Sequence, residues 1–299
     1  MTAPTFSESL AAIEGIQVHS GGRRESDNDL PLASIAIATF NAAEVLPATL
    51  DSIAAQTWSN IEVTIADGGS NDGTLDVIQA HAAVISRWIS APDSGISDGF
   101  NRAVALTTGS AVHIIAAADR LMPDQIERSM ILLRDNPNAG IAYGDVEMID
   151  SDGHTTRIAH GISDYHLRHH DSMALVPHMA LCARRKTYEQ VGLFDPDIRF
   201  VMDFDWLARC WRSGIKGIYS NTVGTRMTEG GFNNRHAIAR DLENFMVTRR
   251  YKTMPMIMAV PRLGLRLVMD VIRLGLEYLG AERASFAFRR WVDVCLGRT

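Results

Sequence analysis

The chain has 299 residues, of which 46% are hydrophobic and 21% charged, and its formal net charge is −6. This composition excludes disordered and fibrous proteins and suffices for one large domain with an appendage. Three widely spaced cysteines, Cys182, Cys210 and Cys295, form no CxxC pair, which argues against a disulfide framework or zinc site and favours a reducing cytoplasm. No leader pattern opens the chain, and no window approaches the roughly 18 apolar residues of a spanning helix. We therefore expect a cytoplasmic protein, either soluble or peripheral on the inner face of the plasma membrane.

Charge is distributed unevenly along the chain. Residues 252–299 contain eight basic and four acidic residues, a local net charge of +4, which leaves −10 for the rest of the chain. An acidic body disfavours binding to nucleic acid. A basic tail suits an anionic membrane surface.

Residues 1–30 show no sustained periodicity and are expected to form a flexible lead-in. Strands and helices are then predicted to alternate. The expected strands cover 32–38, 61–66, 87–90, 111–117 and 140–149, and the expected helices cover 42–56, 71–84, 96–109 and 123–137. This alternation predicts an α/β fold with a mostly parallel sheet flanked by helices. In such a sheet, ligands bind beyond the carboxyl ends of the strands.

Polar residues follow the first two expected strands. Thr39 and Asn41 come after the first, and Asp67 followed by Gly68 and Gly69 comes after the second. A carboxylate at a strand end can accept hydrogen bonds from a base, and glycine amides can approach a polar ligand closely. A tight turn capped by the aspartate explains this segment equally well. The absence of GxGxxG and GxxxxGK[ST] patterns disfavours dinucleotide dehydrogenases and P-loop enzymes.

Two long segments resemble family 2 glycosyltransferases. The run SIAIATFNAAEVLPATLDSIAAQTWSNIEVTIADGGSNDGTLDVI resembles their opening, and SAPDSGISDGFNRAVALTTGS resembles their PDxGxxDAxNxG stretch. The resemblance covers about residues 32–231. It implies an inverting, nucleotide-sugar-dependent transferase with a Rossmann-like GT-A domain over 31–250. Residues 31–145 would form its nucleotide-binding half and 146–250 its acceptor half, followed by an amphipathic basic helical tail over 251–299.

The resemblance also implies roles on the donor side. Thr39 and Asp67 would contact the nucleotide, with Asn41 and Gly69 in the same loops, and UDP is the default from family frequency. Asp93 and Asp98 match acidic positions bordering the nucleotide and sugar. A helix-start role for Asp98 stays open, and Asn101 and Arg102 are equally well explained as surface residues of the same helix.

The metal motif of this family is reduced in this sequence. Members usually carry Asn-Ala-Asp-Asp or Asp-x-Asp after the fourth core strand, where it holds a divalent cation against the diphosphate. Here Ala118 stands where an aspartate is expected, and Asp119 is the remaining carboxylate. Mg²⁺ or Mn²⁺ takes oxygen ligands, including water and phosphate, so Asp119 is the candidate ligand. A catalytically impaired relative that binds nucleotide-sugar or a partner protein is the alternative.

The segment FDPDIRFVMDFDWLAR resembles the family pattern FDExxxxxEDxDxxxR. By this resemblance, Asp203 is the base that removes the proton from an acceptor hydroxyl, although helix capping remains an alternative. Asp205 would face away from Asp203 in a helix and is interpreted as a capping or orienting residue. His178 matches a histidine that members often have in a strand near the acceptor site, and a structural histidine explains it nearly as well.

Gly230 and Gly231 resemble the family's late GGxS loop, which closes over the donor diphosphate. His236 is interpreted as a solvated loop residue rather than a metal ligand. The histidines at 166, 169 and 170 are expected in an exposed loop, because no carboxylate or cysteine shares their spacing.

The tail segment RLGLRLVMDVIRLGLEYL predicts an amphipathic helix. Its charges at 262, 266, 270, 273 and 277 form one stripe, and the remaining surface is apolar. The apolar face is expected to be buried against the protein or a partner subunit, as in a homo-oligomer, or in a membrane interface. The acceptor would be a saccharide or a lipid-linked molecule in cell-surface polysaccharide or glycolipid biosynthesis. A nucleotidyltransferase of similar layout would need a basic glycine-rich loop after the first strand, which the sequence lacks.

Overall fold

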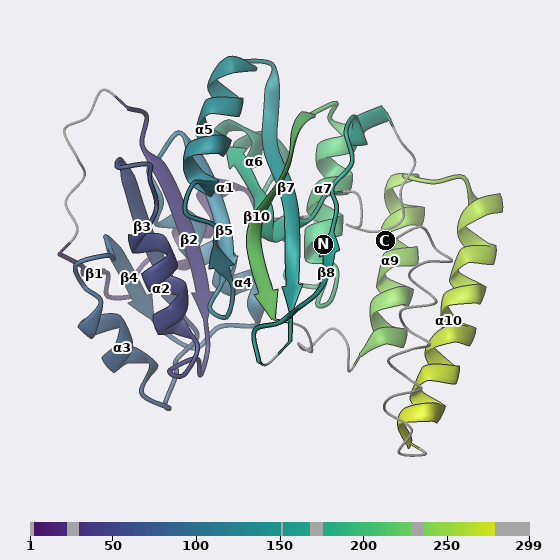
Figure 1. Cartoon of the computed structure of the whole chain (residues 1–299), viewed down its shortest axis with the longest axis horizontal. Coiled ribbons are helices and arrows are strands. Elements are labelled where there is room, and N and C mark those ends of the chain that lie inside the picture. The colour runs from purple at the N-terminus through teal and green to yellow at the C-terminus, as the bar shows by residue number, and fades with distance from the viewer. Residues whose placement is uncertain (1–2, 23–29, 151, 168–175, 229–235, 279–299) are drawn as a thin grey trace.

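The computed structural model describes residues 3–22, 30–150, 152–167, 176–228 and 236–278. A ten-stranded sheet forms the centre of the molecule, and helices cover its two faces (Figure 1). The helices are α1 (Phe6–Ala12), α2 (Leu46–Ala54), α3 (Thr74–Ala80), α4 (Ile96–Ala105), α5 (Gln125–Asp135), α6 (Arg185–Val191), α7 (Met202–Arg212), α9 (Ala237–Tyr251) and α10 (Met256–Tyr278), with 3₁₀ turns η1 (Tyr165–Leu167) and η3 (His178–Ala180).

The strands are β1 (His19–Ser20), β2 (Ala33–Thr39), β3 (Ile61–Asp67), β4 (Arg87–Ser90), β5 (Ala111–Ala116), β6 (Arg120–Leu121), β7 (Ala139–Ile149), β8 (Thr155–Ala159), β9 (Leu181–Arg184) and β10 (Lys216–Thr228). Their order is β1-β4-β3-β2-β5-β9-β7-β10-β6, and β8 pairs with β7. Strands β4, β3, β2 and β5 pair in parallel, as do β7 and β10, while β9 runs antiparallel between β5 and β7. The predicted α/β fold with a mostly parallel sheet flanked by helices is confirmed.

Strand β2 shows how the sequence builds two cores. Ile35 and Ile37 point to the side covered by α2 and α5, and Ala36 and Ala38 point to the side covered by α4. The alternation follows from the two-residue period of a strand, and burial of both faces explains its continuous apolar run. The small alanines let α4 approach closely: a Cβ added to Gly99 would lie 3.1 Å from the Cβ of Ala38.

The N-terminal segment contains more regular structure than the sequence pattern suggested. Helix α1 begins with a capping box, in which Thr5 Oγ1 accepts from the Glu8 amide and the Glu8 carboxylate accepts from the Thr5 amide. Strand β1 pairs antiparallel with β4. A helix of only seven residues is too short for periodicity to reveal, although the capping pattern was readable.

Helices α9 and α10 form an antiparallel pair beside the sheet, and α9 packs against α7 (Figure 1). Within the described part of the chain, no helix combines the length and apolar character needed to cross a bilayer.

Candidate active site

Three polar residues end neighbouring parallel strands. Thr39 pairs in register with Asp67, and Asp67 with Ser90, so their side chains lie at the same carboxyl edge of the sheet. Ser90 Oγ donates to Asp67 Oδ2 over 2.6 Å. The structure thus brings Thr39 and Asp67 together and adds Ser90. Ser90 is the polar last residue of a predicted strand, which is a signal that the sequence analysis did not use.

The Asp67 carboxylate organises the loop that follows it. The amides of Gly69 and Ser70 each donate to Oδ2 over 3.0 Å, and Ser70 Oγ donates to Oδ1. Asn41 joins this loop to the end of β2, because its amide donates to Ser70 Oγ and its Oδ1 accepts from the Asn71 amide. Gly69 has a φ of +84°, a conformation that favours glycine. The capped turn is therefore formed, and it shapes the edge on which a ligand would rest.

The Thr39 hydroxyl differs from its neighbours. Its Oγ1 is buried and has no hydrogen-bond partner among the described residues. A buried polar atom without a partner is costly. A ligand group reaching the end of β2 would remove that cost.

Asp93 lies against two glycines at the same edge. A Cβ added to Gly68 would lie 2.8 Å from Asp93 Oδ2, and one added to Gly99 would lie 3.1 Å away. The Gly95 amide donates to Oδ1 over 2.9 Å. Burial raises the pKa of Asp93, and the nearby carboxylates of Asp98 and Asp67 add to this rise.

Asp98 lies in the first turn of α4, and both of its carboxylate oxygens accept hydrogen bonds. Arg102 donates to both carboxylate oxygens over 3.0 Å, and the Ser94 amide donates to Oδ2 over 3.0 Å. Arg102 also donates to the Pro92 carbonyl. In the structure, Asp98 holds the loop before α4 in place, as the helix-start interpretation expected.

Asn101 is buried rather than at the surface. Its Nδ2 donates to the Phe194 carbonyl over 2.8 Å, and its Oδ1 accepts from the Phe194 amide over 2.9 Å. One turn earlier, Ser97 Oγ donates to the Ile198 carbonyl and to Met202 Sδ. These contacts fasten α4 to the segment that leads into α7.

The reduced metal motif forms the turn after β5. Thr49 Oγ1 donates to the carbonyls of Ala117 and Asp119, which fixes this turn to α2. Ala118 is exposed, whereas the Asp119 side chain is buried. Burial raises the pKa of Asp119 to about 7, and a hydrogen bond from the Ala116 backbone partly offsets that rise. A nearby cation would favour the ionised form, so Asp119 fits a divalent metal as one oxygen ligand.

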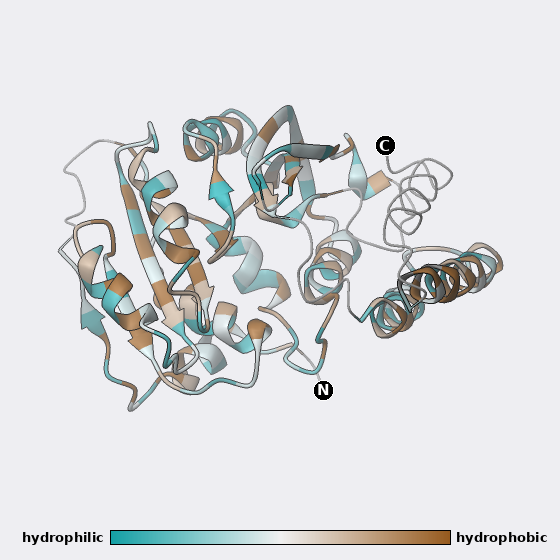
Figure 2. Ribbon diagram, turned by 60° about the horizontal axis from the view of Figure 1, so that its bottom comes forward, coloured by the Kyte–Doolittle hydropathy of each residue, from teal (hydrophilic) through white to brown (hydrophobic). Residues whose placement is uncertain are grey.

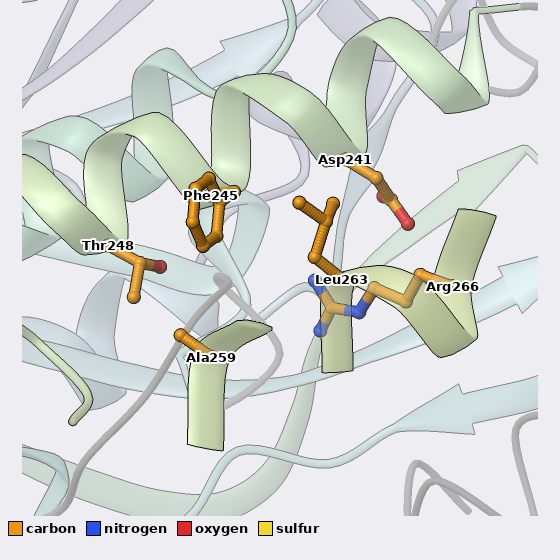
Figure 3. Close-up of a pocket in the computed structure, with 6 residues that line it drawn as sticks. All are labelled: Asp241, Phe245, Thr248, Ala259, Leu263 and Arg266. Carbon is orange, nitrogen blue, oxygen red and sulfur yellow. The ribbon is translucent and has the colours of Figure 1, made fainter. Parts of the chain in front are cut away.

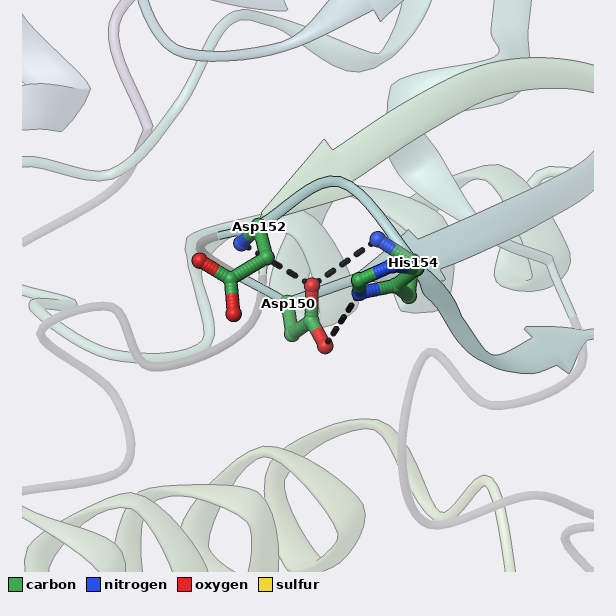
Figure 4. Close-up of side chains that lie close together, drawn as sticks. All are labelled: Asp150, Asp152 and His154. Atoms are coloured by element: carbon green, nitrogen blue, oxygen red, sulfur yellow. Dashed lines mark hydrogen bonds and ion pairs between the residues drawn. The ribbon is translucent and has the colours of Figure 1, made fainter.

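A second group of possible ligands lies on the β7–β8 hairpin. Asp150, Asp152 and His154 place their ligand atoms within 4.8 Å of one another (Figure 4). Asp150 Oδ1, however, already accepts from the amides of Asp152 and His154, and the latter two side chains are exposed. These contacts are those of a carboxylate-capped turn, and we assign no function to the group.

Asp203 is the second residue of α7 and is half-buried. Burial raises the pKa of Asp203 to about 6, and the Phe204 amide, which donates to Oδ1 over 2.7 Å, partly offsets the rise. A carboxylate with a pKa near the working pH can be ionised at rest and still accept a proton.

Asp205 points into the protein and is fully buried. Arg209 Nε donates to its Oδ2 over 3.0 Å, and Arg250 Nη1 lies 3.6 Å from its Oδ1. Arg250 also pairs with Asp195. This network joins α7 to α9.

His178 lies in the turn η3, directly before β9, rather than in a strand. Both ring nitrogens are buried and have no partner among the described residues, and the ring packs edge-on against Phe194. Burial, with a contribution from His113, lowers the pKa of His178 to about 3, so the ring is neutral.

Several residues singled out in the sequence lie outside the described residues or next to them. Gly230, Gly231 and the histidines at 169 and 170 lie outside the described residues. His166 is half-buried in η1, and His236 is exposed just before α9, where its ring stacks on Phe200.

The structure is an α/β fold whose central sheet carries polar residues at the carboxyl ends of its parallel strands. Comparison with known proteins shows which family has this chain as a member. The family model for glycosyl transferase family 2 matches residues 34–192. A PGL/p-HBAD biosynthesis glycosyltransferase from Mycobacterium tuberculosis is 31% identical over 249 residues, 81% of this chain and 90% of that protein. Chondroitin synthase from Escherichia coli is 28% identical over 59% of this chain and 26% of the synthase. The chain belongs to glycosyl transferase family 2.

Solved glycosyltransferases share the fold. The mannosyltransferase PcManGT from Pyrobaculum calidifontis, in complex with GDP-Man and Mn²⁺, aligns with a TM-score of 0.61 and 15% identity over 96% of this chain and 89% of its own. Residues 1–349 of S. aureus TarS, in complex with UDP, align with a TM-score of 0.55 and 12% identity over 72% of this chain, which spans 64% of the TarS chain. At these identities the likeness concerns the fold.

Proposed function

We propose that this glycosyltransferase is an inverting, GT-A-type hexosyltransferase that moves a sugar from a nucleoside-diphosphate sugar to an acceptor hydroxyl. The observation that carries the proposal is the contact between the first turns of α4 and α7. Ser97 Oγ lies 3.0 Å from Met202 Sδ, so the turns that contain Asp98 and Asp203 adjoin. The helix that carries the proposed base is thereby held against α4, the helix that begins beside the acidic edge of Asp67, Asp93 and Asp98.

The donor would lie along that edge. The unpartnered Thr39 hydroxyl would contact the base and ribose, together with Asn41 after β2 and Asp67 and Gly69 at the end of β3. Asp93 and Asp98 would border the ribose and sugar. The solved neighbours in complex with UDP, UDP-GlcNAc and GDP-Man support a nucleotide-sugar donor, with UDP as the default nucleotide.

Asp119 would hold Mg²⁺ or Mn²⁺ at the end of β5, with the diphosphate and water completing the oxygen ligands. When bound, the cation neutralises charge on the diphosphate leaving group. Because Ala118 removes one expected carboxylate, we expect weak metal binding by the protein in the absence of nucleotide.

Asp203 would act on the acceptor. Its carboxylate accepts the proton of the acceptor hydroxyl while the hydroxyl oxygen bonds to C1 of the sugar. The bond from C1 to the diphosphate breaks on the opposite side, so the configuration at C1 inverts and the nucleoside diphosphate leaves with the electron pair. Neutral His178 beside Phe194 and the Gly230–Gly231 loop are proposed to border the sugar and acceptor.

The role of the mycobacterial relative in PGL/p-HBAD biosynthesis supports a lipid-linked or polysaccharide acceptor. We accordingly place this chain at the cytoplasmic face of a membrane as a peripheral protein.

The test uses purified full-length enzyme, Mn²⁺ and a panel of UDP-, GDP- and TDP-sugars. Asp203→Asn should lower transfer or donor hydrolysis by about 10²–10⁴-fold and leave nucleotide affinity unchanged. Asp197→Asn, at an exposed carboxylate nearby, is the matched control and should keep wild-type activity. Wild-type protein that binds nucleotide but transfers nothing would instead indicate a non-catalytic relative, and full activity in Asp203→Asn would remove Asp203 as the base.

A further inference from the structure

Helix α10 packs with its polar side inward. Asp270 is buried, and its Oδ2 lies 3.9 Å from Arg240 Nη2 on α9. Arg266 lines a small pocket between α9 and α10 together with Asp241, Phe245, Thr248, Ala259 and Leu263 (Figure 3). Two members of the charged stripe, Arg266 and Asp270, therefore face the protein, although a soluble helix would normally turn such a stripe to water, whereas Arg262 at its start is exposed.

The opposite side of α10 is apolar and exposed. Figure 2 shows α10 at the edge of the molecule, coloured as hydrophobic along much of its length. Ile257 is 85% exposed, Val268 57% and Val271 61%, and the series continues to Tyr278. Other exposed apolar residues on this helix are Met258, Val260, Leu265, Ile272 and Leu274. A continuous apolar patch of this kind marks a contact with a partner or a membrane.

The charge around this patch favours a membrane over a partner protein. Residues 244–269 contain five basic residues and no acidic residue, in a chain with a net charge of −6. Arg249 and Lys252 are exposed at the turn between α9 and α10. A second copy of the chain could cover the apolar residues, but its own 244–269 segment would offer no counter-charge to this turn. An anionic lipid surface offers both an apolar layer and negative charge.

We propose that the outward face of α10 and the α9–α10 turn dock on an anionic phospholipid bilayer, with α10 lying flat in the interface. In this orientation the exposed aliphatic side chains enter the region between headgroups and acyl chains, and Arg249 and Lys252 meet the lipid headgroups. Tyr278, 92% exposed at the end of the helix, has the amphipathic ring typical of that depth.

The hairpin formed by α9 and α10 is connected by hydrogen bonds and ion pairs to the segment that carries Asp203. Glu243 on α9 accepts hydrogen bonds from the amides of Arg199 and Phe200, over 3.2 and 2.8 Å. Arg250, also on α9, pairs with Asp195 and Asp205 on either side of the base. If Asp203 is the base, as proposed above, docking holds it at a fixed place relative to a lipid-borne acceptor; the docking itself does not depend on that role.

Co-sedimentation of the full-length protein with vesicles tests this directly. Vesicles of phosphatidylcholine containing phosphatidylglycerol should bind the protein, whereas phosphatidylcholine alone should bind it weakly. Each basic residue near an anionic surface contributes about fivefold to affinity, so Lys252→Glu should weaken binding by about that factor or more. The double variant Val268→Asp, Val271→Asp should weaken it by about tenfold or more, because charged groups would enter the apolar layer.

Two control variants test whether loss of vesicle binding is specific to the α9–α10 hairpin, because they make similar changes elsewhere on the surface. Leu167→Asp changes an apolar side chain that is 76% exposed on the protein body, and Lys216→Glu reverses an exposed charge on β10; both should bind vesicles as the wild type does. Unchanged binding by the α10 double variant, or equal binding to both kinds of vesicle, overturns the proposal. A dimer seen by sedimentation velocity and dissolved by the double variant would assign the face to a second copy instead. Vesicle binding without sugar transfer would leave docking intact and contradict only the enzymatic proposal.

Discussion

The Asn101 side chain pairs with the backbone of Phe194, donating to its carbonyl over 2.8 Å and accepting from its amide over 2.9 Å. The two residues are 93 positions apart. This one side-chain amide therefore connects α4 to the segment that leads to Asp203.

Asn101→Ala should destabilise the protein by about 2–4 kcal/mol, because it leaves the buried amide and carbonyl of Phe194 without partners. Chemical denaturation measures the change. Asn138→Ala, at an exposed asparagine in the turn before β7, should stay within about 0.5 kcal/mol of wild type. Equal stability of the two variants would show that the pairing with Phe194 is dispensable.

The pH dependence of transfer should report Asp203. Its pKa is raised to about 6 by burial, so the rate at saturating donor and Mn²⁺ should fall as pH drops through about 6, where the base becomes protonated. A rate that is constant down to about pH 5 would argue against Asp203 as the base.

The same shift has a consequence for stability. The folded form binds this proton more tightly than the unfolded chain, whose carboxyl has the ordinary pKa of 3.8. Asp203 should therefore add stability as pH falls from about 6 to 4, the reverse of a carboxylate whose pKa is lowered. Comparing the pH dependence of unfolding in wild type and Asp203→Asn isolates this contribution.

Ala118→Asp should strengthen the metal site proposed at Asp119. The side chain at 118 is exposed beside the buried Asp119, so an added carboxylate can reach the cation without a large burial cost. The Mn²⁺ concentration that gives half-maximal activity should fall by about tenfold, which corresponds to one further charged contact of about 1.4 kcal/mol. Glu127→Asp, which keeps a carboxylate on α5, is the control and should not alter this concentration. No change in Ala118→Asp would place the metal elsewhere than beside Asp119.

Asp205→Ala should be among the most destabilising single changes in α7. It would leave the buried Arg209 side chain without its carboxylate, at a cost of about 3–5 kcal/mol. The exposed pair of Arg134 and Asp135 provides the comparison: Asp135→Ala should change stability by no more than about 1 kcal/mol. Thermal or denaturant unfolding of both variants measures the difference, and similar small losses would contradict the structural role assigned to Asp205.

Much of the sheet and its ligand edge could be predicted from local patterns. Strands β2 and β3 are buried on both faces and rich in apolar residues, although β3 includes the buried polar residues Glu62 and Thr64, and Thr39 and Asp67 stand at the ends of these strands. A residue that ends a predicted strand of a parallel sheet must lie at the carboxyl edge of that sheet, so its place can be predicted from the sequence. The antiparallel strand β9 was not predicted, since a four-residue segment has too little pattern to distinguish it from a loop.

The sequence alone determined that α10 has a charged stripe and an apolar face, because helical spacing fixes which side chains share a side. Only the tertiary structure decided that Arg266 and Asp270 of the stripe face α9 and that the apolar face points outward, since periodicity defines two faces but not which of them meets the protein. The same holds for Asn101, which local pattern could equally place at the surface, and for Asp205, whose partner Arg250 is 45 residues away on α9. Such choices depend on contacts between distant segments, and these form only when the packed elements exclude water and leave each buried polar group in need of a partner.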